Sequence, residues 1–390
     1  MDASRVRQRN LAAVLTLVHR SSGATRADLT RALGLNRSTI GDLVGTLAEH
    51  GWVDEVDDAP RQGVGRPSPH VVPRAERLVV AVNPELDAIE VGLVALGGRV
   101  IARRRVAIDS PTVDLAVSIT ARVARELADE VAVEHPSSRL VAVGAAVPGL
   151  VRREDGLVRL APHLGWREQP VATPLAAALG VPARAANDAQ LGCLAELAFG
   201  AGLGARTLVY LNGGASGIGG GIVVDGRLVE GRDGHAGELG HLSVDPRGPV
   251  CACGARGCLE AVVSRAQLVE ALKIEHPDDD ELAAALATAL ADGADPAIAI
   301  IIAEQFAGLR VGLRAIATML NPERIVLGGY LATLWATVSA AARAGALNDA
   351  LPPIGAGVRI EPADLGANRL LVGAAELAWE PLLADPLASR

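Results

Sequence analysis

Apolar residues at the start of the chain recur every three or four positions and are separated by short polar breaks, which predicts helices. The first helix is predicted over residues 4–20. A second begins after Thr25, a good N-cap, and ends at Gly34. A third begins after Asn36 and is stopped by Gly51. The tight link after Gly34 gives the second and third helices the spacing of a helix-turn-helix.

Two extended segments are predicted to follow the third helix. Residues 52–56 are predicted to form a short strand, and residues 57–63 are predicted to form a polar turn. Residues 64–72 return as a second extended segment, so that the whole unit is predicted to be a winged helix. Arg66 lies between Gly and Pro in this segment, a context suited to phosphate or minor-groove contact, with simple solvation as the alternative. Residues 73–77 are predicted to be a linker.

The residues that begin the third helix are the candidates for reading DNA bases. In a helix-turn-helix, the N-terminal residues of the second of the two helices enter the major groove. Here they are Arg37, Ser38 and Thr39, hydrogen-bonding types that lie off the apolar face. Arg37 is the best candidate for a base contact, because a guanidinium fits guanine O6 and N7 bidentately. A three-helix bundle with an exposed polar edge is the alternative interpretation.

Charge is distributed unevenly along the chain. The chain has 37 basic and 45 acidic residues, which gives a net charge of −8. Between residues 5 and 47, seven arginines face two aspartates, so this segment carries +5 and the remainder −13. A small basic module fused to an acidic body indicates a nucleic-acid-binding head, with an ordinary arginine-rich surface as the alternative. Aromatic residues make up only 2%, which disfavours the stacking of unpaired bases.

From residue 78 the pattern changes to continuous apolar runs of strand length that alternate with amphipathic segments. This alternation indicates α/β architecture with a largely buried sheet. A similar alternation restarts near residue 207, which predicts two successive halves with a cleft between them. The predicted strands are residues 78–82, 90–96, 99–108, 140–147, 207–211, 221–224 and 324–327, and the predicted helices are residues 114–133 and 298–319.

Composition and the N-terminus indicate the compartment. Half of the residues are hydrophobic, which supplies a large core and excludes a disordered chain. The apolar run at residues 297–303 is far shorter than the ~20 residues that span a bilayer, so no membrane association is predicted. Residues 11–18 follow three arginines as in a signal peptide, but His19-Arg20 comes directly after them and no cleavage site follows. We therefore expect a cytoplasmic protein with reduced cysteines.

One histidine and three cysteines are clustered within 18 residues: His241, Cys251, Cys253 and Cys258. In a reducing compartment, clustered thiols are more often metal ligands than disulfides. Three cysteines and one histidine saturate tetrahedral Zn²⁺, so the predicted site is closed and structural rather than catalytic. Free thiols in a loop are the alternative. Cys193 lies outside the cluster on a predicted helix, and we expect it to be a small buried apolar residue.

Two further groups accompany predicted strands. Asn187-Asp188 follows one strand and offers an amide and a carboxylate that can bind hydroxyl groups, and the Asp can act as a base. An Asn-Asp pair is also common in ordinary turns. Residues 213–221 form a glycine-rich loop between two strands. Such loops expose backbone N–H groups to phosphate, but a simple hairpin turn has a similar composition.

Together these residues resemble the ROK family (repressors, open reading frames and sugar kinases) over nearly the whole chain. Residues 161–166 look like the family's segment ahead of the sugar site, and Asn187-Asp188 matches its catalytic-base motif. Residues 235–260 match the family signature and its zinc site, and residues 325–329 look like its nucleotide-side motif. The resemblance implies an α/β body with the duplicated actin-like ATPase (ribonuclease H-like) sugar-kinase fold. The winged helix-turn-helix in front is the arrangement of the family's repressors.

The resemblance also implies domain limits and sugar contacts. Residues 1–77 would form the DNA-binding domain with its linker. Residues 78–390 would form the sugar-kinase-like domain, with one lobe of about residues 78–185 plus the C-terminal helix and another of about residues 186–370. His241 would use one ring nitrogen for Zn²⁺ and the other for a hydroxyl group. The implied sugar-binding residues are Asn187, Asp188, Glu238, His241 and Glu260.

The chain departs from the family's kinases where those enzymes have an Asp-x-Gly-Gly-Thr phosphate loop. Here the segment is Asn83-Pro84-Glu85-Leu86-Asp87, which lacks the metal-side Asp and both glycines. A carboxylate there would repel a triphosphate, and a leucine side chain obstructs close approach to the backbone. Ala215-Ser216 replaces the usual Gly-Thr of the second loop. We therefore expect no catalysis, with Asp188 as the relic of the base.

The sequence thus predicts a sugar-responsive transcriptional regulator, a repressor, that binds double-stranded operator DNA as a homodimer or homotetramer. The expected effector is a sugar or sugar derivative, and the expected structural cofactor is Zn²⁺. The expected location is the bacterial cytoplasm, with the nucleoid when DNA is bound. One alternative is an active ATP-dependent sugar kinase with an accessory DNA-binding head. Another is a regulator with a vestigial pocket that senses a partner protein, but retention of all five hydroxyl-binding positions argues against it.

Overall fold

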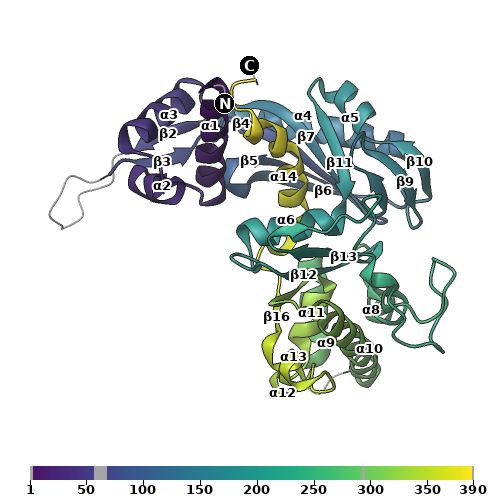
Figure 1. Cartoon of the computed structure of the whole chain (residues 1–390). Coiled ribbons are helices and arrows are strands. Elements are labelled where there is room, and N and C mark those ends of the chain that lie inside the picture. Colours follow the sequence, from purple (N-terminus) through teal and green to yellow (C-terminus); the bar gives the residue numbers. More distant parts are fainter. Residues whose placement is uncertain (1–2, 57–67, 292–294, 389–390) are drawn as a thin grey trace.

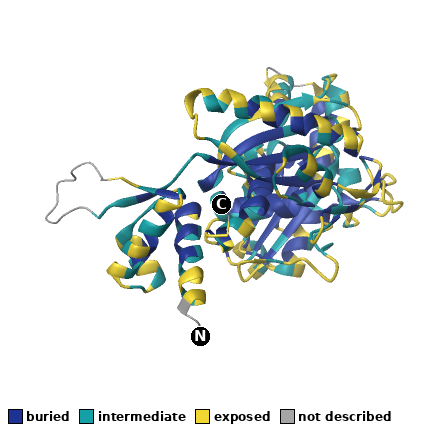
Figure 2. Ribbon diagram, turned by 90° about the horizontal axis from the view of Figure 1, so that it is seen from above, coloured by how far each residue is buried: buried dark blue, intermediate teal, exposed yellow. Residues whose placement is uncertain are grey.

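The chain folds into a small N-terminal head beside a larger body of two lobes (Figure 1). The computed structural model describes residues 3–56, 68–291 and 295–388. Buried residues run through the sheets of the body and along the inner faces of the head helices, as the dark blue ribbon in Figure 2 shows. The core of the first lobe continues into the head, because apolar residues of both pack into one cluster.

The head has the helices that the apolar pattern predicts. Asn36 Oδ1 accepts a hydrogen bond from Thr39 N at 2.8 Å, and this cap fixes the start of the third helix. Gly34 has a left-handed φ of 65° and ends the second helix, so the two helices meet at the predicted turn. The elements of the head are α1 (Ala3–Arg20), β1 (Ala24–Thr25), α2 (Arg26–Leu33), α3 (Arg37–Glu49), β2 (Val53–Val56) and β3 (His70–Pro73).

The wing is a three-stranded sheet in the order β1-β3-β2. Strands β2 and β3 pair antiparallel, with Val53 opposite Pro73 and Val56 opposite His70. This pairing confirms the two extended segments expected after the third helix. The tip between the two strands, which includes Arg66, lies outside the described residues.

The first lobe is built on a five-stranded sheet in the order β11-β7-β4-β5-β6. Strands β4, β5 and β6 form an antiparallel meander. Strand β7 pairs parallel to β4, and β11 pairs parallel to β7. Side chains alternate between the two faces, so Val80 and Val82 pack toward α4 whereas Val79 and Ala81 pack toward the C-terminal helix. The elements are β4 (Arg77–Pro84), β5 (Ala88–Ala95), β6 (Arg99–Ala107), α4 (Val113–Glu134), β7 (Arg139–Val147), α5 (Ala172–Leu179) and β11 (Ala183–Asn187), with a small separate sheet of β8 (Leu150–Arg152), β9 (Leu157–Ala161) and β10 (Trp166–Pro170).

The second lobe repeats this topology after the connecting helix α6 (Asp188–Phe199). Its sheet has the order β14-β13-β12-β15-β16, again with an antiparallel meander on one side of the first strand and parallel strands on the other. The same order and the same strand directions in both lobes confirm the predicted duplicated fold. The strands are β12 (Leu208–Gly214), β13 (Gly217–Val224), β14 (Arg227–Leu228), β15 (Arg324–Gly329) and β16 (Arg359–Pro362).

Helices fill the remainder of the second lobe. By length and apolar composition alone, α10 (Pro296–Leu320) could span a membrane, but the core helix of a soluble protein meets the same criteria. Its side chains Ile302, Leu309 and Leu313 are buried in the second lobe's apolar cluster. The helices are α7 (Leu259–Val262), α8 (Arg265–Leu272), α9 (Asp279–Leu290), α10 (Pro296–Leu320), α11 (Tyr330–Thr337), α12 (Ala340–Ala344) and α13 (Pro352–Gly357).

The C-terminal helix α14 (Arg369–Ala384) returns to the first lobe and lies very close to its neighbours (Figure 1). A Cβ at Gly144 of β7 would overlap the carbonyl oxygen of Ala374. A Cβ at Gly373 would likewise overlap the backbone of Leu191 in α6. Glycine is therefore required on both sides of this contact, because any side chain would push α14 away from the sheet or from α6.

The head is joined to the body through α14. His19 is fully buried and bonds Glu376 through Nε2 at 2.8 Å, while its Nδ1 accepts a hydrogen bond from Gly97 N at 2.9 Å. Trp52 packs edge-on against Trp379, with ring centroids 6.5 Å apart. A buried histidine with both nitrogens bonded holds one orientation, so these contacts fix how α1 lies on α14.

We predict that Gly144→Ala will destabilise the protein, because the added methyl group has no space beneath α14. Overpacking of this kind costs about 1–3 kcal/mol. The matched control is Gly45→Ala in α3, where an added Cβ meets nothing within 4 Å. That change should leave the free energy of unfolding unchanged or raise it by up to about 1 kcal/mol through helix propensity. Denaturant unfolding of both variants measures the difference, and equal stability would contradict the close packing.

Candidate ligand pocket and metal centre

A pocket lies between the two lobes, where β4, β7 and β11 end and the β12–β13 hairpin approaches from the second lobe. Open α/β sheets bind ligands at such carboxyl ends. None of the described residues that line this pocket is lysine or arginine. The structure brings all five residues that the resemblance implies as sugar contacts to this one pocket: Asn187, Asp188, Glu238, His241 and Glu260.

Asn187 and Asp188 are positioned by the start of α6. Asn187 is the N-cap: its Oδ1 accepts a hydrogen bond from Gln190 N at 2.9 Å, and its Nδ2 donates to Gly149 O at 3.0 Å. Asp188 follows as the first residue of the helix and is buried. Burial and the nearby Glu238 carboxylate raise the pKa of Asp188 to about 6. Asp188 can therefore accept or donate a hydrogen bond near neutral pH.

Four side chains beside the pocket form a cluster that could hold a metal ion. One ligand atom from each of them lies within 4.8 Å of all the others, and the four are His241, Cys251, Cys253 and Cys258. The thiol of Cys251 lies 3.6 Å from His241 Nδ1. Gly254 has a left-handed φ of 90°, which lets the chain turn back between the cysteines. Cys193 lies outside the cluster, fully buried in α6, as its surroundings in the sequence predict.

The cluster and the pocket share side chains. His241 turns Nδ1 toward Cys251 and places Nε2 3.7 Å from a carboxylate oxygen of Glu238. Glu260 Oε1 accepts a hydrogen bond from the Cys251 thiol at 2.9 Å, and Glu260 Oε2 accepts one from Ile218 N at 3.4 Å. A metal ion held by these thiols would therefore fix two side chains of the pocket at the same time.

Two pocket residues were not recognised as ligand contacts from the sequence. His163 lies within the segment 161–166 that resembles the family's stretch ahead of the sugar site, and its position there was the available signal. Glu85 lies in the segment that departs from the kinase phosphate loop, and it lines the pocket from the turn after β4. Burial, together with the neighbouring Asp188, raises the pKa of Glu85 to about 7.

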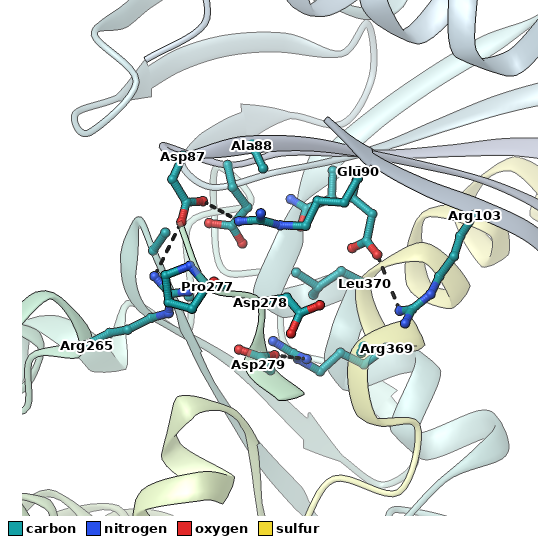
Figure 3. A pocket seen from close by; sticks show the side chains of 16 residues that line it. Asp87, Ala88, Glu90, Arg103, Arg265, Pro277, Asp278, Asp279, Arg369 and Leu370 are labelled. Atoms are coloured by element: carbon teal, nitrogen blue, oxygen red, sulfur yellow. Dashed lines mark hydrogen bonds and ion pairs between the residues drawn. The ribbon is translucent and has the colours of Figure 1, made fainter. Parts of the chain in front are cut away.

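Glu85 also lines a second cavity. Charged side chains surround this cavity, and several of them form ion pairs (Figure 3). Asp87 lies 3.1 Å from Arg105 of the first lobe and 3.5 Å from Arg265 of the second. Arg369 at the start of α14 lies 2.7 Å from Asp279 of α9. Most of the arginines that line this cavity are therefore paired with its carboxylates, and two of the pairs connect the lobes.

The glycine-rich residues 213–221 belong to a β-hairpin rather than to an open loop. Strand β12 runs to Gly214 and β13 begins at Gly217, so only Ala215 and Ser216 form the turn. On the first-lobe side, Asn83 Nδ2 donates a hydrogen bond to Ala146 O at 3.0 Å. The hairpin tip touches both cavities, because Gly214 lines each of them.

The candidate DNA contacts lie together at the start of α3. Arg37 and Ser38 are exposed and Thr39 is partly buried. Arg37 makes no hydrogen bond or ion pair with any residue that the structure describes, whereas the Ser38 hydroxyl bonds Asn36 Oδ1 at 2.8 Å. Arg66, the fourth candidate, lies outside the described residues.

The fold and the pocket define a sugar-kinase-like body that carries a helix-turn-helix head. Comparison with known families agrees: residues 80–380 match the model of the ROK family, and residues 9–57 match the IclR helix-turn-helix domain. The chain belongs to the ROK family.

Relatives and solved structures include both regulators and kinases. The chain is 27% identical to a xylose repressor of Bacillus spizizenii over 98% of both chains, and 29% identical to a glucokinase of Halalkalibacterium halodurans over 77% of this chain and 94% of the enzyme. A crystal structure of a ROK family transcriptional regulator, a homologue of the E. coli MLC protein, superposes with a TM-score of 0.73 at 25% identity over 98% of both chains. A ROK family glucokinase from Streptomyces griseus in complex with glucose and AMPPNP gives 0.62 at 26% identity, over 78% of this chain and 99% of the enzyme.

Proposed function

We propose that the protein is a transcriptional repressor that binds operator DNA through residues 1–77 and senses a sugar in the pocket between the lobes of residues 78–390. The observation that carries this proposal is that the head packs on α14, and α14 packs on the helix that begins in the pocket. The relatives named xylose repressors make D-xylose the first effector to test.

The two sites are connected by a short chain of contacts. Asn187 and Asp188 start α6, and α6 meets α14 where Gly373 lies against Leu191. Three residues further along α14, Glu376 bonds His19 of the head. A sugar that moves α6 would therefore move the surface on which the head lies. Linked sites of this kind typically change each other's affinity by roughly 5- to 150-fold.

DNA recognition by the head requires pairing of two heads. Helix-turn-helix proteins bind half-sites about 34–36 Å apart, so a homodimer or homotetramer is the form that would bind the operator. A change in the angle between head and body would alter the spacing of the paired heads. The cytoplasm of a bacterium, with the nucleoid when DNA is bound, is the compartment where such a protein acts.

We further propose that the metal cluster holds one structural Zn²⁺. Cys253 Sγ and Cys258 Sγ lie 3.7 Å apart, about the separation of two thiolates on a tetrahedral Zn²⁺ with bonds of about 2.3 Å. The fourth ligand is His241, whose other nitrogen stays free for the pocket. When bound, the ion supplies no reaction chemistry and orders the loop that carries His241 and the cysteines.

The zinc proposal predicts about one Zn²⁺ per chain, measured by elemental mass spectrometry on purified protein. Cys258→Ser should lower this content well below one and weaken sugar binding, because metal binding and local folding are coupled. Cys193→Ala is the matched control, since its thiol lies outside the cluster, and it should keep the full zinc content. Parent protein that lacks zinc and still binds sugar would contradict the proposal.

The body is proposed to have no kinase activity. The acidic turn after β4 carries Glu85 and Asp87, and their carboxylates lie where the resemblance implies the phosphates of a nucleotide. We predict no measurable phosphorylation of D-glucose or D-xylose in a coupled ATP assay. Turnover in the usual kinase range of about 1–100 per second would instead support the alternative of a sugar kinase with a DNA-binding head.

Variants at the two proposed sites should have opposite effects. Glu238→Gln should abolish the response of DNA binding to D-xylose and leave sugar-free DNA binding intact. Arg37→Ala should weaken DNA binding by about 1–3 kcal/mol and leave the affinity for sugar unchanged. The measurement is a titration of labelled duplex, selected from a random-sequence pool by the parent protein, at one fixed salt concentration.

The control for Arg37 is Arg314→Ala, which removes the same charge from an exposed position of α10 in the second lobe. It should leave DNA binding unchanged. Equal DNA affinity of Arg37→Ala and the parent would show that the recognition helix is misassigned. An undiminished sugar response of Glu238→Gln would show that the pocket is misassigned.

A further inference from the structure

Glu85 occupies the wall between the ligand pocket and the arginine-lined cavity, and it lines both. It lies in the turn between β4 and β5, and its carboxylate reaches across the cleft to the hairpin tip of the second lobe. The Ser216 hydroxyl donates a hydrogen bond to Glu85 Oε2 at 3.3 Å. A Cβ built on Gly214 would lie only 2.9 Å from Glu85 Oε1. The carboxylate is thus held at the junction of the lobes.

One oxygen of this carboxylate is left without a protein donor. Glu85 Oε2 bonds Ser216, whereas Oε1 receives no hydrogen bond from any residue in the described part of the chain. Glu85 also has no ion-pair partner there, although Arg265 and Arg369 line the adjacent cavity. Those arginines are already paired with Asp87 and Asp279. A partly buried carboxylate oxygen without a donor favours a ligand that supplies one.

The charges around the pocket restrict what that ligand can be. Four carboxylates line the pocket, those of Glu85, Asp188, Glu238 and Glu260. None of the described lining residues is a lysine or arginine that would balance their charge. Such a pocket suits a neutral polyol, whose hydroxyl groups donate hydrogen bonds to carboxylates. A phosphate or carboxylate group on the ligand would meet like charges at close range.

We propose that Glu85 is a specificity residue of the pocket: it accepts a hydrogen bond from a hydroxyl group of the sugar and excludes the corresponding sugar phosphate. This inference rests on the proposed function, because it assumes that the pocket binds a sugar. It adds that the effector is the unphosphorylated sugar. The protein would thus respond to the free sugar, before a kinase converts that sugar to its phosphate.

The test compares affinities for D-xylose, D-glucose, D-xylopyranose 1-phosphate and D-glucose 6-phosphate by titration calorimetry on the full-length protein. The parent should bind a free sugar and discriminate against its phosphate. Glu85→Ala should weaken binding of the free sugar about tenfold through loss of a hydrogen bond to a charged group. Above pH 7, where the Glu85 carboxylate is ionised, Glu85→Ala should also lower the ratio of free-sugar to phosphate affinity at least about tenfold, because one repelling charge is removed. Glu85→Gln keeps the size and one acceptor, so it should change the ratio while keeping more of the free-sugar affinity.

Asp87→Asn is the matched control, because it removes the same charge from the same turn but Asp87 lines only the other cavity. Its affinity ratio should equal that of the parent, and thermal unfolding confirms that each variant is folded. An unchanged ratio and unchanged free-sugar affinity in Glu85→Ala would overturn the inference, as would a parent that prefers a phosphate.

Asp188→Asn separates failure of this inference from failure of the proposed function. If Asp188→Asn loses sugar binding while Glu85→Ala binds like the parent, the pocket is correct and only the role of Glu85 is wrong. If the parent binds none of the four compounds, the proposed function is contradicted, and the inference falls with it.

Discussion

The close approach of α14 to the sheet of the first lobe is the constraint on which the other contacts depend. Gly144 and Gly373 leave no side chain between α14 and its two neighbours, β7 and α6. A helix seated this deeply presents its remaining surface to the head, where Trp379 meets Trp52 and Glu376 meets His19. Packed interiors transmit displacement because they contain few voids. The head therefore packs on α14, and α14 packs on the helix that begins in the candidate ligand pocket.

The same helix also connects the lobes at its first residue. Arg369 is buried and bonds Asp279 at 2.7 Å and Asn212 at 2.8 Å, both in the second lobe. A buried guanidinium without such partners would be strongly destabilising, so the cleft cannot separate at this point without a large cost. The pairs of Asp87 with Arg105 and Arg265 lie nearby and are longer, at 3.1 Å and 3.5 Å. The lobes are thus held together at Arg369 by two short contacts and around it by longer ion pairs.

Local sequence signals predicted the elements and much of the pocket. The caps at Thr25 and Asn36, the periodic apolar faces and the buried strands depend on neighbouring residues, so they are readable from a single chain. The metal cluster was visible because its ligands are close in sequence. What could not be predicted depends on contacts between distant segments. Nothing around His19 indicates its bond to Glu376, and the glycines that admit α14 look like any others in the sequence.

Glu85 is a second case in which the sequence did not reveal a contact between distant segments. The sequence identified Glu85 only as a departure from the phosphate loop of the family's kinases, which says nothing about where its carboxylate lies. Only the fold places its carboxylate beside Ser216 of the other lobe and in the same pocket as Asp188. A substitution that removes one function can add another when the new side chain faces a binding site, and that direction is a property of the three-dimensional structure.

The pocket is lined by side chains of both lobes, so a bound ligand would contact both and favour a particular arrangement of the lobes. Glu85, His163 and Asn187 come from elements of the first lobe, whereas Glu238 and Glu260 come from the second. A ligand shifts a conformational equilibrium only as far as its affinities for the two states differ. An open cleft would offer the sugar one set of hydrogen-bond partners, and a closed cleft would offer both. If these residues bind a sugar, division of the contacts between the lobes would produce the difference in affinity that a sugar-responsive regulator requires.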